Sequence, residues 1–119
     1  DIAYAYIMKH DYEKAESYLR NAIQYYPEYF KPTYFMGTLK YQQKQFDQAR
    51  KYLLDADQII PGVPKIRLLL GESFEATGDI STAIQYYKYV YESDPNGQLG
   101  QVAARHLLRL GILKPARRY

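Results

Sequence analysis

The segment QFDQARKYLLDADQIIP at positions 45–61 has two counterparts in the 119-residue chain that align with it without a gap. They are DYEKAESYLRNAIQYYP at 11–27 and DISTAIQYYKYVYESDP at 79–95, so successive segments start 34 residues apart. A fixed period of roughly 20 to 50 residues is typical of repeat proteins. The sequence therefore predicts a row of similar structural units.

Five positions of the aligned segments keep one type of residue. The second is aromatic or aliphatic, the fifth is alanine, the ninth is large, the twelfth is small or β-branched, and the last is proline. The first four are three or four residues apart, which puts them on one face of a helix. Each segment therefore predicts an amphipathic helix of about 14 residues, which the proline ends. The ninth position holds Leu19, Leu53 and Tyr87.

A second set of helices is predicted between these, at 30–42 and 64–76, each with a proline near its first turn. Gly37 and Gly71 lie in the middle of these helices, where glycine costs about 1 kcal/mol relative to alanine. We expect the glycines to let Leu53 and Tyr87 of the following helix pack against the backbone.

Short linkers join the predicted helices. In one of them, Gly78 is suited to a left-handed helix end and Asp79 to the start of the next helix. Short linkers force neighbouring helices to run antiparallel. The predicted fold is therefore all-α, with helical hairpins that bury their apolar faces by stacking on one another.

This pattern resembles the tetratricopeptide repeat family, whose 34-residue unit reads W-x2-L-G-x2-Y, then A-x3-F, then P. Met36-Gly37 and Leu70-Gly71 fill the L-G pair, and Phe74 fills the following Tyr position. Thr33 and Arg67 stand in place of Trp, and Lys40 in place of one Tyr. The resemblance implies a right-handed superhelix. The remaining matches are Ala15/Leu19, Ala49/Leu53, Ala83/Tyr87, Pro27, Pro61 and Pro95.

The resemblance divides one domain, 1–119, into a partial first repeat at 1–27, repeats at 28–61 and 62–95, a capping helix within 96–111 and a tail at 112–119. The chain begins inside a repeat. We therefore expect an apolar face around Ile2, Tyr6 and Ile7 that favours self-association. The capping helix is expected at 98–110, with Ile112, Leu113 and Pro115 folding back on it.

In this family the first helix of each repeat lines the concave side of the superhelix, which implies a groove that binds a peptide or a partner protein. A groove that mixes tyrosine with lysine and glutamate suits such a ligand, because tyrosine offers a large contact area and a polar hydroxyl. Tyr34 and Tyr41 are the tyrosines expected to bind. The groove residues that the resemblance implies are Lys31, Tyr34, Thr38, Tyr41, Lys65, Leu68, Glu72, Glu75, His106 and Arg109.

One subgroup of the family holds C-terminal carboxylates with a set of lysine, asparagine and arginine residues. Lys65 matches one of these lysines, but Leu69 and Phe35 stand where an arginine and an asparagine belong. We therefore do not expect that carboxylate site here.

Catalysis, metal binding and a cofactor are not expected. The chain has no cysteine, and His10 and His106 are its two histidines, without metal-ligand spacing. Glu72 and Glu75 lie one turn apart on one helix, whereas paired catalytic carboxylates face each other across a cleft. The interpretation is a non-enzymatic interaction scaffold.

The alternative is a basic C-terminal end that contacts nucleic acid or an anionic membrane. It rests on Arg105, Arg109, Lys114, Arg117 and Arg118. The net charge of +3 is mild and the cations suit a helix C-terminus, so both ligands are disfavoured. A chain without cysteine does not indicate its compartment.

Overall fold

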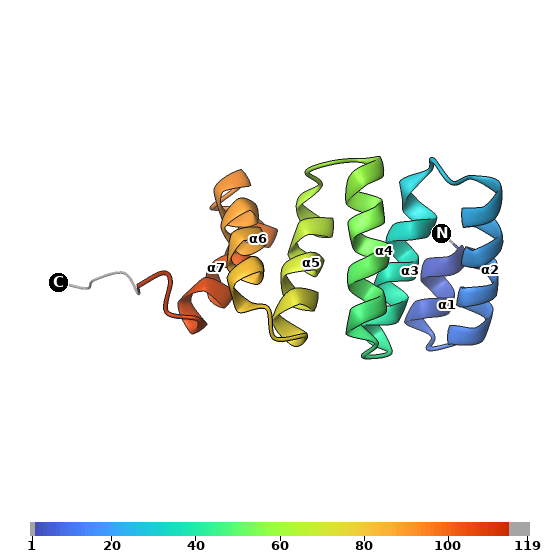
Figure 1. Ribbon diagram of the computed structural model, residues 1–119, viewed down its shortest axis with the longest axis horizontal. Helices are drawn as coiled ribbons and strands as arrows, with labels where there is room; N and C mark the ends of the chain where they lie inside the picture. Colours follow the sequence, from blue (N-terminus) through green and yellow to red (C-terminus); the bar gives the residue numbers. More distant parts are fainter. Residues whose placement is uncertain (1, 115–119) are drawn as a thin grey trace.

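The computed structural model describes residues 2–114, which form seven α-helices and no strand. Three antiparallel hairpins, α1–α2, α3–α4 and α5–α6, stand side by side, and α7 packs against the last of them (Figure 1). The predicted helices are confirmed, and α7 ends one residue before its expected end. Their bounds are α1 (Ile2–Met8), α2 (Tyr12–Tyr25), α3 (Phe30–Gln42), α4 (Phe46–Ile59), α5 (Pro64–Ala76), α6 (Ile80–Ser93) and α7 (Gln98–Arg109).

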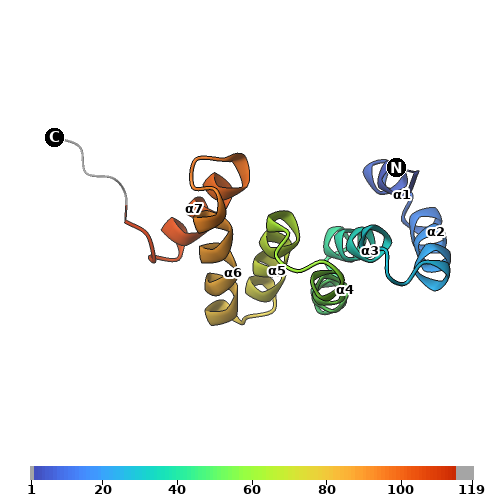
Figure 2. The ribbon, with the colours of Figure 1, turned by 90° about the horizontal axis from the view of Figure 1, so that it is seen from above.

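The stacked hairpins make an elongated, curved body of 56 × 25 × 24 Å. Its radius of gyration is 15.3 Å, whereas a compact domain of this length has about 13.5 Å. Helices α1, α3, α5 and α7 line one side of the row, and α2, α4 and α6 line the other (Figure 2). In the view of Figure 2, α1 and α7 at the two ends of the row lie higher than α3 and α5 in its middle. The side lined by the odd-numbered helices is therefore concave.

Both mid-helix glycines are sites of close helix packing, as predicted. A Cβ atom added at Gly37 would lie 2.7 Å from Leu53 Cγ, and one added at Gly71 would lie 2.7 Å from Tyr87 Cε1. Optimal carbon–carbon contacts are about 3.5–4.0 Å. Glycine is therefore what lets α4 and α6 approach the backbones of α3 and α5.

The turn inside each hairpin has a residue with left-handed backbone. Gly78 has φ +91°, and the Asp79 side chain accepts a hydrogen bond of 3.2 Å from the Thr82 N–H, so both predicted capping roles are confirmed. Lys44 and His10 precede Gly78 by one and two 34-residue periods and have φ 61° and 60°. The same turn is thus made twice without glycine.

The core lies between neighbouring helices in three clusters. The first joins α1, α2 and α3, the second joins α4 and α5, and the third joins α5, α6 and α7. Leu113 packs against the third cluster, after Gly111 turns the chain at φ +79° and the Ile112 N–H bonds to the Leu107 carbonyl. The expected return of the chain over α7 is therefore confirmed for Leu113, whereas Ile112 is 41% exposed and Pro115 lies outside the described residues.

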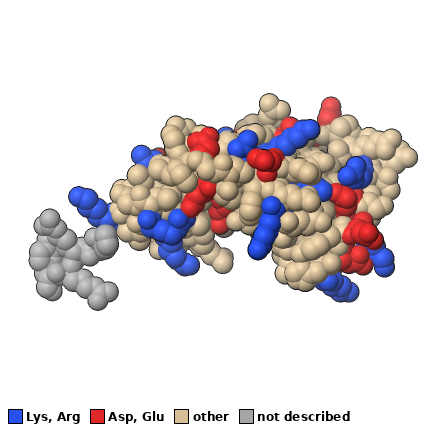
Figure 3. Space-filling model, turned by 60° about the horizontal axis from the view of Figure 1, so that its bottom comes forward, with Lys and Arg blue, Asp and Glu red and all other residues tan. Residues whose placement is uncertain are grey.

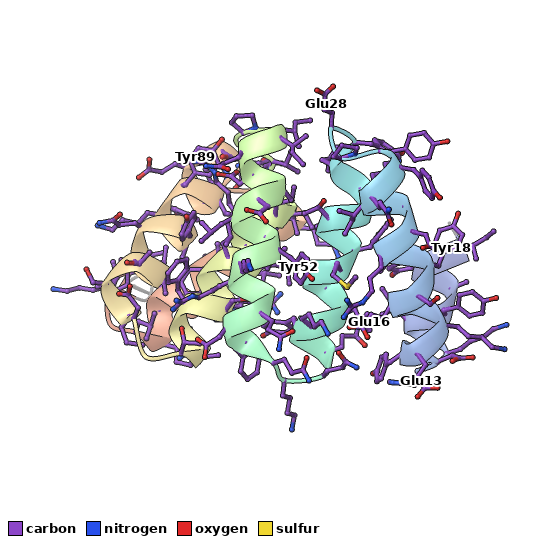
Figure 4. All side chains as sticks on the ribbon, turned by 45° about the vertical axis from the view of Figure 1, so that its right-hand side comes forward. Glu13, Glu16, Tyr18, Glu28, Tyr52 and Tyr89 are labelled. Atoms are coloured by element: carbon purple, nitrogen blue, oxygen red, sulfur yellow. The ribbon has the colours of Figure 1, made fainter. Side chains whose placement is uncertain are left out.

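One position of α2, α4 and α6 recurs at each junction between neighbouring elements but holds a different type of side chain each time. It is occupied by Glu16, Arg50 and Ile84, which are 34 residues apart. At the first junction, Lys40 is buried and pairs with Glu16, which points from α2 toward α3 (Figure 4). One period later the Arg50 guanidinium lies 4.6 Å from the centre of the Phe74 ring. At the third junction the position belongs to Ile84, which packs against the third cluster. The departure at Lys40 is thus accommodated by a carboxylate from the neighbouring hairpin.

The first hairpin exposes positions that its counterparts bury. Ile2 is 56% exposed, whereas Met36 and Leu70, one and two periods later, are fully buried. Tyr18 is 45% exposed on the outer side of α2, whereas Tyr52 is half-buried against the first cluster (Figure 4).

The prediction of an exposed apolar face around Ile2, Tyr6 and Ile7 was wrong for Ile7. Ile7 is fully buried because its side chain points into the first cluster, and Tyr6 is half-buried against the same cluster. Ile2 is exposed as expected, and the exposed apolar surface of the first hairpin also includes Met8 and Tyr18.

Candidate functional site

The predicted groove residues lie on α3, α5 and α7, and nine of the ten are half-buried or exposed. Lys31 and Lys65 are exposed in the first turns of α3 and α5. Leu68 differs from the expectation, because it is 7% exposed and packs in the third cluster beside Val90. Leu68 thus supports the groove from beneath.

Five of the predicted residues meet around one cavity of about 240 Å³ at the C-terminal ends of α3, α5 and α7. We call this cavity the groove pocket. Sequence reasoning included neither Ala76 nor Tyr87 in the site. The lining residues are Tyr41, Glu72, Glu75, Ala76, Tyr87, His106 and Arg109.

Glu75 is the most strongly bonded side chain of the pocket. Arg109 approaches it with both terminal nitrogens, at 2.7 Å to Oε2 and 2.8 Å to Oε1, and the Tyr87 hydroxyl donates to Oε1 at 2.7 Å. The hydrogen bond from Arg109 is the largest cause that lowers the pKa of Glu75, and the bond from Tyr87 adds to it against the opposing effect of burial. Glu75 is therefore ionised and fixed in place.

His106 lies between Glu72 and Arg109 and contacts both side chains. Its Nε2 lies 3.1 Å from Glu72 Oε2, and its Nδ1 lies 2.9 Å from Arg109 NH2. Because arginine only donates, Nδ1 is the acceptor and the ring proton sits on Nε2, where it is donated to Glu72. The ring stacks on Tyr87 with centroids 4.5 Å apart and an interplanar angle of 11°. The stacking on Tyr87 and the two polar contacts thus fix the orientation of the His106 ring.

Two tyrosines of α3 border the concave side. Burial, followed by the charges of Glu72 and Glu75, raises the pKa of the Tyr41 hydroxyl, so this group stays protonated. Burial is also the largest cause that raises the pKa of Tyr34. The Tyr41 ring packs edge-on against Phe46, with centroids 5.2 Å apart. Both rings therefore combine a packed edge with a polar hydroxyl.

The sequence held a signal for the pocket network that sequence reasoning missed. Glu72 and His106 are separated by one period of 34 residues, and so are Glu75 and Arg109. Residues one period apart occupy equivalent positions on neighbouring hairpins, so a donor paired with an acceptor at this spacing predicts a bond between α5 and α7.

The basic residues of the alternative site differ in their surroundings. Arg105 and Lys114 are exposed, whereas Arg109 is paired with Glu75; Arg117 and Arg118 lie outside the described residues. Basic and acidic side chains are interspersed on the face drawn in Figure 3.

Within residues 2–114 no group of three or more His, Cys, Asp or Glu side chains is arranged to hold a metal ion. In the same range no helix is long and apolar enough to cross a membrane.

Comparisons with known proteins agree with this architecture. Two sequence models described as "Tetratricopeptide repeat" match residues 6–72 and 66–97. Among solved structures, the N-terminal domain of stress-induced protein-1 (STI-1) from C. elegans is similar, with a TM-score of 0.73, 18% identity, and 88% of each chain covered. No curated protein matches the chain. The chain therefore belongs to the tetratricopeptide repeat family, whose repeats generally form non-catalytic scaffolds for protein–protein interaction.

Proposed function

We propose that the concave face of α3, α5 and α7 binds a peptide segment of a partner protein and that the chain is not an enzyme. The observation that carries this proposal is the groove pocket, to which four helices, α3, α5, α6 and α7, contribute aromatic, acidic and basic side chains. The hydrogen bonds among Glu72, Glu75, His106 and Arg109 hold the pocket in shape, which lowers the entropy cost of binding.

The experiment is a selection from a random 12-residue peptide library displayed on phage, followed by fluorescence anisotropy with synthetic copies of the selected peptides. Replacing Tyr34 and Tyr41 together with alanine should weaken binding at least tenfold, because aromatic anchors dominate such interfaces. Tyr25→Ala is the matched control, since Tyr25 is 73% exposed on α2, away from the concave side. Thermal melting establishes that each variant is folded. Unchanged affinity in the folded double variant would contradict the proposal.

We also propose that the exposed end of the first hairpin binds a second copy of the chain. The difference in exposure between Ile2 and its buried counterparts supports this, because apolar side chains at this position are covered elsewhere in the row. Light scattering should show dimers whose fraction rises with concentration, and Ile2→Lys combined with Tyr18→Lys should abolish them. Tyr25→Lys is the control, and a wild-type chain that stays monomeric at high concentration would refute the proposal.

Contact of the basic C-terminal end with nucleic acid or an anionic membrane remains the alternative proposal for the function. Its support is weaker, because Arg109 is paired with Glu75. Titration with single-stranded RNA and with vesicles containing phosphatidylserine at low salt tests it. Absence of binding under these conditions removes the proposal.

A further inference from the structure

The lining of the groove pocket holds more carboxylate groups than guanidinium groups. It includes two carboxylates, Glu72 and Glu75, and one guanidinium, Arg109. Arg109 approaches Glu75 with both terminal nitrogens, and Glu72 has a polar contact to the His106 ring instead. Glu72 is therefore the carboxylate of the pocket that has no guanidinium partner.

No other cation of the groove neutralises Glu72. Lys65 lies seven residues earlier on α5, which corresponds to about 10 Å along the helix axis. Charges at this separation are largely screened at physiological salt, where the Debye length is about 8 Å. Among the described residues, the one hydrogen bond of Glu72 is made by Oε2 to His106, so Oε1 is available to a ligand.

An aromatic ring lies on the same cavity. Tyr41 borders the groove pocket from α3, on the other side from α7, and its side chain is half-buried. A cation near an aromatic face gains about 0.5–2 kcal/mol, depending on its exposure to solvent. The chain uses this interaction elsewhere, since Arg50 lies over Phe74 at 4.6 Å and Arg67 over Tyr89 at 4.3 Å.

We propose that the groove pocket receives a basic side chain, lysine or arginine, of the bound peptide, with its cation between the Glu72 carboxylate and the Tyr41 ring. This inference rests on the proposed function of the groove. A carboxylate and an aromatic ring together recognise a cation by charge and by its apolar stem, and the cavity of about 240 Å³ has room for such a side chain. An acidic side chain at this place would be repelled by Glu72.

The test uses peptides selected from the random library and labelled with fluorescein. Each lysine is replaced in turn with norleucine and each arginine with citrulline, which remove the charge and keep the carbon stem of the side chain. At one basic position this change should weaken binding about tenfold, as expected for loss of a charge-assisted hydrogen bond. Glu72→Gln should cause the same loss with the unmodified peptide, and the two changes together should cost no more than either alone.

Glu92→Gln is the matched control, because Glu92 is exposed on α6 and does not line the groove pocket. The glutamine at position 72 still accepts the hydrogen bond from His106, so the network stays closed. Peptides that lose affinity in the Tyr34→Ala variant but keep it after Glu72→Gln would overturn this inference and leave the groove function standing. Failure to recover any peptide whose affinity depends on Tyr34 would overturn both.

Discussion

Gly71→Ala should destabilise the protein, although the same change in an ordinary helix interior stabilises it by about 1 kcal/mol. The new Cβ would lie 2.7 Å from Tyr87 Cε1 and 3.3 Å from Tyr86 Cβ, so the Tyr87 ring must retreat by about 1 Å to reach a normal contact. The ring is held by its hydrogen bond to Glu75 and by stacking on His106, so it cannot retreat freely.

Overpacking of this kind costs about 1–3 kcal/mol, and weakening the Tyr87 bond to a charged acceptor adds about 1 kcal/mol. After the gain in helix propensity is subtracted, the free energy of unfolding should fall by about 2 kcal/mol. This corresponds to a fall in Tm of about 8 °C for a domain of this size.

Urea and thermal denaturation followed by circular dichroism measure the effect. Lys51→Ala and Lys51→Gly provide the reference, because Lys51 is exposed inside α4 and the pair isolates helix propensity. There the alanine variant should be more stable by about 1 kcal/mol. If Gly71→Ala melts at or above the wild-type temperature while the reference pair behaves as expected, then close packing at Gly71 does not determine its identity.

Three further predictions concern stability. Lys44→Gly should stabilise the protein by about 1 kcal/mol in urea denaturation, because left-handed backbone is costly for a residue with a Cβ. Gly78→Lys should destabilise it by a similar amount. If both variants changed the stability in the same direction, this explanation would be contradicted. Glu16→Gln should lower the free energy of unfolding by about 2 kcal/mol, because Lys40 is then buried without a counter-charge. Adding Lys40→Met should recover most of that stability. If the double variant showed no recovery, the ion pair would not be the cause of the loss. The pKa values of Glu16 and Glu75 are lowered from 4.5, so the folded state binds fewer protons than the unfolded state. The stabilisation by both groups is therefore complete above the unfolded value and is lost as pH falls below about 4.5 through the folded values. Arg109→Gln should flatten this loss in denaturation curves between about pH 5 and pH 3, and an unchanged pH profile would refute the assignment.

The sequence predicted those parts of the fold that depend on residues close together in the chain. The helices, the caps at Gly78 and Asp79, and the close approach at Gly37 and Gly71 follow from local spacing and from the missing Cβ. Leu68 was placed in the groove by family register, yet it is buried. The register assigns a face of the helix, whereas burial depends on how closely the next hairpin packs.

The pairing of side chains from different hairpins was beyond local reasoning. Helical spacing put Glu72 and Glu75 on one face, but their bonds to His106 and Arg109 depend on the distance between α5 and α7. The pair of Lys40 with Glu16 depends in the same way on the packing of α2 against α3. Comparing residues exactly one period apart recovers the first pairs and misses the second, because Glu16 and Lys40 are 24 residues apart.

Because the body is elongated, a small change of angle at one junction between hairpins moves the ends of the protein. Within residues 2–114 each hairpin contacts only its immediate neighbours in the row, so the angle at one junction is set by the side chains packed there. A tilt of about 5° at the middle of a body 56 Å long moves either end by about 2 Å. A ligand that touches α3, α5 and α7 at once would fit the displaced helices less well. Substitutions beneath the helices, far from any bound peptide, will therefore change affinity by altering the curvature of the row.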